Sequence, residues 1–203
     1  MCGSRFCSKD ARPLRLAIFG GTFDPIHNAH LAVAHEAAAR FQLDRIWLVP
    51  AERPPHKHGA THAPYADRLS MVELACRNEP ALEASRLEEG TASSYSIDTI
   101  EKVRARLAPG DELFFVIGAD AFAEIESWRR WRDVVLAVEF IVVSRPGHRY
   151  DVPPAAIVHR LETVDLPVSS SEIRRRLAAG DDCVDVPAAV LDYIRARGLY
   201  NWR

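Results

Sequence analysis

Two glycines and two histidines stand close together near the start of the chain, in types and spacing that suit phosphate chemistry. Gly20-Gly21-Thr22-Phe23 ends an apolar run, and His27 and His30 follow. Glycine lets the backbone approach a ligand closely or turn with positive φ. Exposed N–H groups near a helix N-terminus favour an anion. A helix N-terminus also disfavours imidazolium, whereas an arriving phosphate favours it, so the two histidines could respond to phosphate charge.

Plainer interpretations of this stretch stay open. The glycine pair could be a tight turn and the histidines could be surface residues. A metal pair is a third interpretation, but His27 and His30 have no third ligand in clear register. The two histidines are three residues apart at the start of a helix, so their rings are expected on the same side. Asp24 precedes Pro25 and is expected only to fix the turn.

A second polar cluster lies towards the other end of the chain. Ser169-Ser170-Ser171-Glu172-Ile173-Arg174 is typical of a capping box, with Ser169 at the N-cap and Glu172 three residues on. Hydroxyls and an arginine at a helix start again suit phosphate. The alternative is simply a well-capped basic helix.

The tryptophans at 128 and 131 are set among arginines. Because its segment is polar, Trp128 is expected to be exposed, and a flat indole can stack on a planar ligand ring. Trp131 is expected to pack inward instead.

Strand-like and helix-like segments alternate along the chain, which predicts the elements that position these residues. The strand-like runs are Leu14–Phe19, Arg45–Val49, Glu112–Ile117 and Phe140–Val143, with weaker candidates at Leu82–Leu87 and Leu161–Leu166. The helical stretches are Asn28–Phe41, Tyr65–Arg77, Ser96–Leu107, Ser170–Ala179 and Pro187–Arg197. This order predicts an α/β fold, a doubly wound parallel sheet with helices on both faces. Ligands then bind beyond the carboxyl ends of the strands. The stretch Ala51–Pro64 is a candidate mobile substrate loop.

Composition narrows the class of protein. The chain has 203 residues and a formal net charge of −2, which fits one domain over residues 14–203 and argues against a general nucleic-acid binder. Residues 1–13 are expected to form a disordered arm. No apolar run approaches the roughly 20 residues that a membrane span needs. The four cysteines fit reduced thiols in a cytoplasmic protein. A homo-oligomer stays open.

Both polar clusters resemble signatures of one family. Gly20–His30 resembles the GGTFDPxHxGH signature of the HxGH nucleotidyltransferases, with Ala29 where the family usually has glycine. Ser169–Arg174 resembles their second motif, SSTxIR, with Ser171 in place of threonine.

The residues between the signatures resemble the bacterial nicotinate mononucleotide adenylyltransferases. Pro54–Lys57 is similar to their PPHK loop, Gly90–Thr99 to their GxSYTxDT stretch, Gly118–Asp120 to their GAD turn, and Ser144–Gly147 to their RPG turn. The resemblance runs from about Leu14 to Tyr200. In that family a tryptophan at the place of Trp128 stacks on nicotinate, and Arg129 follows here where tyrosine is usual.

The resemblance implies a Rossmann-like nucleotidyltransferase that converts ATP and nicotinate mononucleotide into deamido-NAD and pyrophosphate. It implies Mg²⁺ carried by the ATP phosphates, with no metal ligands supplied by the protein. It assigns the catalytic roles to His27, His30, Lys57 and Arg174. ATP would be bound by Gly20, Gly21, Thr22, Phe23, Gly118, Asp120, Ser170 and Ser171, and the mononucleotide by Ser94, Tyr95, Trp128 and Arg145.

Two rival functions stay open. One is another adenylyl- or cytidylyltransferase of the same signature, such as a phosphopantetheine or glycerol-phosphate enzyme. The other is a nucleotide-binding sensor without turnover. The Trp128 segment argues against the first, and the retention of both histidines, Lys57 and Arg174 argues against the second.

Overall fold

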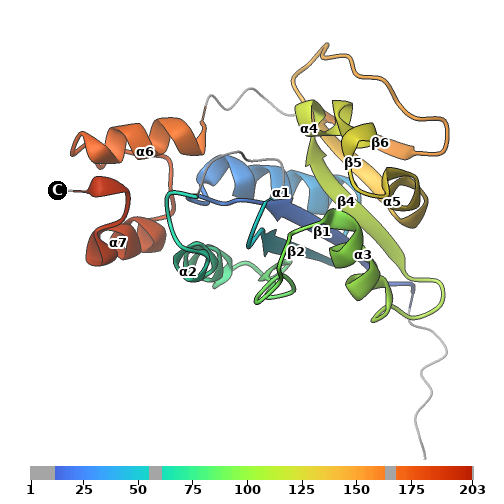
Figure 1. The fold of residues 1–203 in the computed structure, drawn as a ribbon, viewed down its shortest axis with the longest axis horizontal. Helices are drawn as coiled ribbons and strands as arrows, with labels where there is room; N and C mark the ends of the chain where they lie inside the picture. Colours follow the sequence, from blue (N-terminus) through green and yellow to red (C-terminus); the bar gives the residue numbers. More distant parts are fainter. Residues whose placement is uncertain (1–11, 55–60, 163–167, 203) are drawn as a thin grey trace, which may run out of the picture.

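The computed structural model describes residues 12–54, 61–162 and 168–202, and within them six strands form one sheet (Figure 1). The strand order is β3-β2-β1-β4-β5-β6, and every neighbouring pair is parallel. The strands are β1 (Arg15–Gly21), β2 (Arg45–Pro50), β3 (Leu82–Ala84), β4 (Glu112–Gly118), β5 (Glu139–Ser144) and β6 (Ile157–Glu162). The predicted doubly wound parallel sheet is therefore confirmed.

Helices cover both faces of the sheet because alternate residues of the central strands point to opposite sides. Ala17 and Phe19 of β1 belong to one buried cluster, and Leu16 and Ile18 belong to the other. The first cluster packs against α1 (Asn28–Arg40), α2 (Tyr65–Cys76), α6 (Ser170–Ala178) and α7 (Ala188–Arg197). The second packs against α3 (Ser96–Arg104), α4 (Ala119–Ala123) and α5 (Trp131–Ala137). Short 3-10 turns lie at Ile125–Ser127 and Leu199–Asn201.

The chain changes direction across the sheet between β1 and β4. From β1 it winds outward through β2 to β3, and α3 then carries it back to β4 on the other side of β1. A ligand of such a sheet binds beyond the carboxyl ends of the two strands at this switch point. Gly21 and Gly118 are the last residues of β1 and β4, so the loops that follow these two strands meet there.

Some predicted boundaries were wrong. The last strand is Ile157–Glu162 rather than Leu161–Leu166, and residues 163–167 lie outside the described residues. This edge strand has the sequence Ile-Val-His-Arg-Leu-Glu and is largely half-exposed, so no continuous apolar run marks it. β3 is also much shorter than predicted. The helices α4 and α5 were not predicted, because they are short and interrupted by the polar segment around Trp128.

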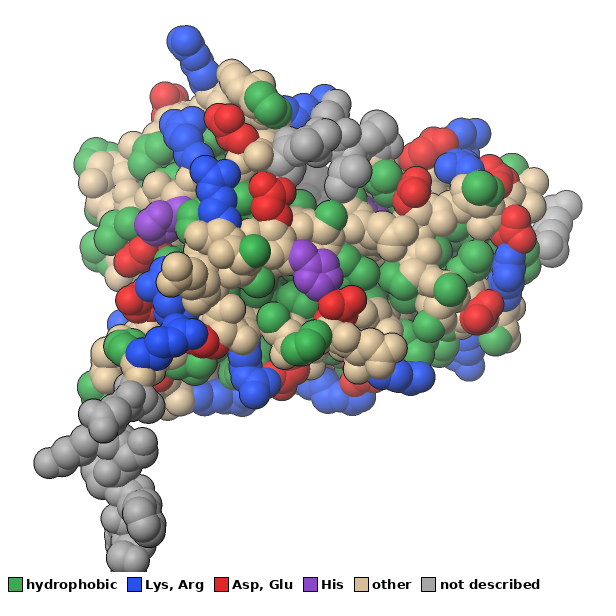
Figure 2. All heavy atoms as spheres, turned by 180° about the vertical axis from the view of Figure 1, so that it is seen from behind, with side chains coloured by type: hydrophobic (Ala, Val, Ile, Leu, Met, Phe, Trp, Pro, Cys, Tyr) green, Lys and Arg blue, Asp and Glu red, His purple; other side chains and the backbone are tan. Residues whose placement is uncertain are grey.

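The predicted arm, residues 1–13, lies mostly outside the described residues, and its disorder stays a prediction. Arg12, near the end of this arm, is among the described residues, and its guanidinium donates to the carboxylate of Asp44 at 3.2 Å. The assignment of residues 14–203 to a single domain also stays a prediction. Among the described helices, none has the length and apolar character that crossing a membrane requires. On the face shown in Figure 2, Lys and Arg side chains are interspersed with Asp and Glu.

Candidate active site

The loop between β1 and α1 is buried and held from several sides. Asp24 is 3% exposed, and its carboxylate accepts hydrogen bonds from the N–H groups of His62 (2.7 Å) and Ala63 (3.1 Å). It also accepts one from the hydroxyl of Tyr200 at 2.8 Å. The peptide bond from Asp24 to Pro25 is cis. Asp24 thus fixes the turn, as expected from sequence, and it also ties the loop to the C-terminal segment.

The glycines of this loop act through close packing. Neither Gly20 nor Gly21 has a positive φ, because both complete β1 as extended residues. A Cβ at Gly21 would lie 2.9 Å from the ring of Phe23, which is too close for any real side chain. Phe23 carries the positive φ instead, at 49°. The alternative that the glycine pair forms the turn is therefore wrong.

The two histidines lie together at the start of α1, as predicted. Their rings stack with 3.7 Å between centroids and 22° between planes. Nδ1 of His30 accepts a hydrogen bond from the backbone N–H of His27 at 3.3 Å, which leaves Nδ1 of His30 unprotonated. The interpretation of this pair as surface residues is wrong for His27, which is 5% exposed.

Burial keeps both imidazoles neutral. Desolvation lowers the pKa of His27 to about 4, and the nearby Asp185 opposes this only partly. Desolvation also lowers the pKa of His30 well below its usual 6.5, and the neighbouring His27 lowers it further. A bound phosphate would favour the protonated forms of both rings. The pair can therefore gain positive charge when a phosphate arrives.

The second signature is in direct contact with this loop. Ser169 caps α6, since its hydroxyl accepts from the N–H of Glu172 at 3.2 Å. The hydroxyl of Ser170 donates to the carbonyl of Pro25 at 3.0 Å across a sequence separation of 145 residues. The guanidinium of Arg174 donates to the carbonyl of Asp24 at 2.7 Å and to the hydroxyl of Ser171 at 3.1 Å. The two motifs thus form one structural unit.

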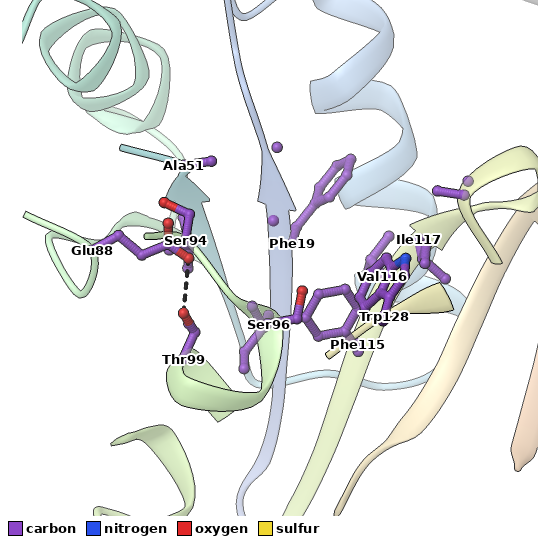
Figure 3. Close-up of a pocket in the computed structure, with 16 residues that line it drawn as sticks. Phe19, Ala51, Glu88, Ser94, Ser96, Thr99, Phe115, Val116, Ile117 and Trp128 are labelled. Atoms are coloured by element: carbon purple, nitrogen blue, oxygen red, sulfur yellow. Dashed lines mark hydrogen bonds between the residues drawn. The ribbon is translucent and has the colours of Figure 1, made fainter. Parts of the chain in front are cut away.

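A cavity of about 200 Å³ opens at the carboxyl ends of β1 and β4 (Figure 3). Gly20, Gly21 and Gly118 line it together with residues from β2, the start of α3 and the 128 segment. One wall is polar: the hydroxyl of Thr99 donates to the carboxylate of Glu88 at 2.8 Å, and the hydroxyl of Ser94 accepts from the N–H of Arg53 at 2.9 Å. The other wall is aromatic. The cavity therefore suits a flat ring with a polar substituent.

Trp128 lies on the aromatic wall. Its ring packs edge-to-face on Phe115, with centroids 6.1 Å apart and planes at 76°, and Figure 3 shows the two side chains next to each other. Trp128 is half-buried and packs against the core cluster of this face, as does Trp131. The expectation that Trp128 is exposed is therefore wrong. The flanking arginines, which suggested exposure, point to the surface while the indole lies inward.

A second hollow adjoins the cavity and shares Glu88 and Thr99 with it. Tyr95 lines this hollow, not the cavity itself. The guanidinium of Arg129 lies over the Tyr95 ring, 4.6 Å from its centroid. Tyr95 and Ser94 thus border neighbouring spaces.

Two further predicted site residues, Asp120 and Arg145, are exposed and do not line the cavity. Asp120 is fully exposed on α4, with Nε2 of His148 at 3.8 Å from its carboxylate. Arg145 is exposed just after β5. Lys57 belongs to residues 55–60, which lie outside the described residues, as does part of the proposed loop Ala51–Pro64.

Two buried charged residues that line the cavity or bond to the signature loop were missed from the sequence. Glu88 is 6% exposed and lines the cavity, but it precedes the motif-like stretch and carries no spacing signal. Arg68 is 0% exposed in α2. It is four residues before Val72 on the apolar stripe of that helix, and an arginine on such a stripe is a sign of a buried, bonded cation.

Comparison with known proteins decides the family. A relative from Solibacter usitatus, named a probable nicotinate-nucleotide adenylyltransferase, is 64% identical over 188 residues, covering 93% of this chain and 100% of the relative. The chain belongs to the nicotinate-nucleotide adenylyltransferase family. Another relative of the same name, from Thermus thermophilus, is 41% identical over 190 residues with the same coverage.

More distant comparisons agree with the family. The cytidylyltransferase-like family model matches residues 18–176. The nicotinic acid mononucleotide adenylyltransferase of Plasmodium falciparum, solved in complex with NaAD, has a TM-score of 0.75 at 23% identity. That alignment covers 94% of this chain and 98% of the solved one. At this identity the match supports the nucleotidyltransferase fold.

Proposed function

We infer that this protein transfers AMP from ATP to nicotinate mononucleotide, giving deamido-NAD and pyrophosphate. The main support for this function is the contact between the two signatures, which are far apart in sequence. Arg174 donates to the carbonyl of Asp24, and Ser170 donates to the carbonyl of Pro25. The two signatures meet beside a cavity at the switch point of the sheet, in a chain 64% identical to a relative named as a nicotinate-nucleotide adenylyltransferase.

The reaction needs no nucleophile from the protein. An oxygen of the mononucleotide phosphate attacks the α-phosphorus of ATP, and the bond from that phosphorus to the bridging oxygen of the β-phosphate breaks. The protein then has to position two polyanions and stabilise the charge that develops on the α-phosphate and on pyrophosphate. We propose that His27 and His30 do this beside the α-phosphate, together with the N–H groups of Thr22 and Phe23. Both histidines are neutral before ATP binds, and they gain donor strength as the phosphate raises their pKa values.

The remaining signature residues would hold the rest of ATP. Ser170, Ser171 and Arg174 are proposed to bind the β- and γ-phosphates. The Arg174 guanidinium has five N–H donors, and its two bonds to described residues leave others for phosphate. Lys57 is proposed to approach the phosphates from residues 55–60. Gly118 and Asp120, at the end of β4 and the start of α4, would face the ribose and adenine.

The cavity is proposed to receive the mononucleotide. Trp128 would stack on the pyridine ring, while Ser94, Tyr95 and Arg145 would contact the rest of the molecule. Glu88 lies on the wall opposite Trp128 in Figure 3. A pyridine carboxylate is therefore expected at the Trp128 end, away from the carboxylate of Glu88.

Mg²⁺ is proposed to enter with ATP. Within the described part of the chain, no group of three His, Cys, Asp or Glu side chains is placed to hold a metal ion. Phosphate oxygens are good Mg²⁺ ligands, so the triphosphate can supply the donors. The ion would neutralise charge on the leaving pyrophosphate.

We also propose a cytoplasmic enzyme without nucleic-acid partners. Cys76 and Cys183 are free thiols, which fits a reducing compartment. The interspersed charges in Figure 2 form no broad basic surface on that face. A homo-oligomer remains compatible with this function.

The function is tested by pyrophosphate release, measured as initial rates with ATP and each of three acceptors. Nicotinate mononucleotide should give the highest kcat/KM, above nicotinamide mononucleotide and phosphopantetheine. A higher rate with phosphopantetheine would support the rival transferase. ATP binding without pyrophosphate release for any acceptor would support the sensor.

A further inference from the structure

Arg68 is a buried cation, and all of its hydrogen bonds to described residues go to the backbone. Its side chain is 0% exposed in α2. The guanidinium donates to the carbonyls of Thr22 (2.7 Å) and Ala51 (2.8 Å). It also donates to the carbonyls of Ala63 (3.2 Å) and Glu52 (3.4 Å). One side chain thus connects the loop after β1, the loop after β2 and the start of α2.

This position is not explained by packing. Burying a cation is unfavourable unless it is fully bonded, and the neighbouring stripe of α2 is made of apolar residues such as Leu69 and Val72. No carboxylate within the described residues forms an ion pair with Arg68, although the buried Asp24 lies near enough to raise its pKa against the effect of burial. The planar fork of an arginine, however, can bond several carbonyls at once. The four hydrogen bonds of Arg68 therefore fix the orientation of the backbone carbonyls that accept them.

The bond to Thr22 has a direct consequence for the next residue. In a trans peptide the C=O and the following N–H point in opposite directions. The only cis bond in the described residues is that from Asp24 to Pro25. Because the Thr22 carbonyl points to Arg68, the N–H of Phe23 points away from it. Two of the three carbonyls that follow are held in the same manner, that of Asp24 by Arg174 and that of Pro25 by Ser170.

We propose that Arg68 is a positioning residue for the adenylyl transfer: by holding the Thr22 carbonyl it presents the N–H of Phe23 to the phosphate of the bound nucleotide. The inference rests on the proposed function. A rotated Thr22–Phe23 peptide would turn a carbonyl oxygen towards the phosphate and repel it. Arg68 also holds the carbonyls of Ala51 and Glu52, at the start of the loop that leads to Lys57.

The matched variants are Arg68→Lys and Asp67→Asn. Lysine keeps the positive charge but is a point donor that cannot reach all four carbonyls. Asp67 is the preceding residue of α2 and is also buried, yet its carboxylate accepts from Tyr193 (2.8 Å) and Arg197 (3.1 Å) of α7. Asp67→Asn therefore weakens the packing of α2 on α7 without touching the signature loop. Both variants are assayed well below their melting temperatures.

Arg68→Lys should lower kcat at least tenfold with little change in KM for nicotinate mononucleotide, whereas Asp67→Asn should keep the wild-type kcat. Wild-type kcat in Arg68→Lys would overturn the proposal. So would an equal loss of kcat in both variants, because that would show a general effect of destabilisation.

A second measurement does not depend on turnover. The chain has eight phenylalanines, so ¹⁵N-phenylalanine labelling gives a short list of amide resonances, and Phe23→Tyr assigns the one from Phe23. A non-hydrolysable ATP analogue should shift the Phe23 resonance in the wild type and in Asp67→Asn, and shift it much less in Arg68→Lys. An unmoved Phe23 resonance in the wild type with the analogue bound would overturn the proposal, even if Arg68→Lys does not fold. A shifted resonance without pyrophosphate release from any acceptor would instead overturn the proposed function and leave the role of Arg68 standing.

Discussion

The imidazole rings of His27 and His30 lie 3.7 Å apart at the start of α1, nearly parallel, and both are neutral. Two stacked neutral rings beside a helix N-terminus form a site that responds to added negative charge. We therefore propose that charge stabilisation at the site depends on this pair more than on any carboxylate.

His30→Ala should lower kcat by roughly two or more orders of magnitude, as expected for loss of a main charge-stabilising donor, while KM for ATP rises far less. His35→Ala is the control, because His35 is an exposed residue of the same helix that contacts Glu79 at 3.2 Å. Steady-state kinetics on both variants measure this. Wild-type turnover in His30→Ala would end the proposed role.

The low pKa of His27 predicts that acid destabilises the fold. Its folded-state pKa of about 4 is below the ordinary 6.5, so the unfolded chain binds a proton more readily between these values. Stability is full above pH 6.5 and is lost as pH falls towards 4, by about 3 kcal/mol for this residue. His27→Gln should flatten this part of the curve. Denaturant unfolding of both proteins at pH 7.5 and pH 5 tests this, and an identical loss in the two would contradict it.

Arg129 is expected to favour the acid over the amide substrate. The guanidinium of Arg130 is already compensated by Glu101 (2.9 Å) and Asp133 (2.7 Å), whereas Arg129 lies on the ring of Tyr95. Arg129→Gln should therefore lower the ratio of kcat/KM for nicotinate over nicotinamide mononucleotide by about two- to fivefold, the range of a partly exposed charge interaction. Arg130→Gln is the control and should leave the ratio unchanged. A wild-type ratio of one or less would show that the pocket does not select the acid.

Trp128→Ala should weaken use of the mononucleotide. Loss of stacking is worth about 1 to 3 kcal/mol, or roughly ten- to a hundredfold in kcat/KM, with KM for ATP little changed. Because Trp128 also packs on Phe115, the melting temperature should fall as well. Trp131→Ala is the control, since Trp131 packs against the same core without lining the cavity. A Trp128→Ala protein that melts early but keeps the wild-type KM for the mononucleotide would remove the stacking role.

The parts of the molecule that are local in sequence could be predicted. β1, α1 and the cap of α6 follow from apolar periodicity and from Ser169 with Glu172, because each pattern is complete within one segment. The position of His27 and His30 side by side at the start of α1 was predicted for the same reason. The sequence prediction misplaced β6 because this edge strand buries few of its side chains, so no continuous apolar run marks its position.

The parts that depend on distant contacts could not be predicted. The burial of Glu88 arises from its contacts with Thr99 and the N–H of Glu52. The inward position of Trp128 depends on Phe115, which lies on β4. In each case the nearby sequence is polar, and only the folded chain supplies the apolar or hydrogen-bonding partner.

The bond from Tyr200 to Asp24 spans 176 residues, and this has a consequence for synthesis of the chain. A nascent polypeptide leaves the ribosome N-terminus first, so β1 and the signature loop emerge long before the hydroxyl that completes the bonding of Asp24. The parallel sheet can form during translation, but the signature loop reaches its final bonding only after Tyr200 has been translated. A chain truncated before Tyr200 would therefore keep most of its sheet but lack the hydrogen bond from Tyr200 that completes the bonding of Asp24.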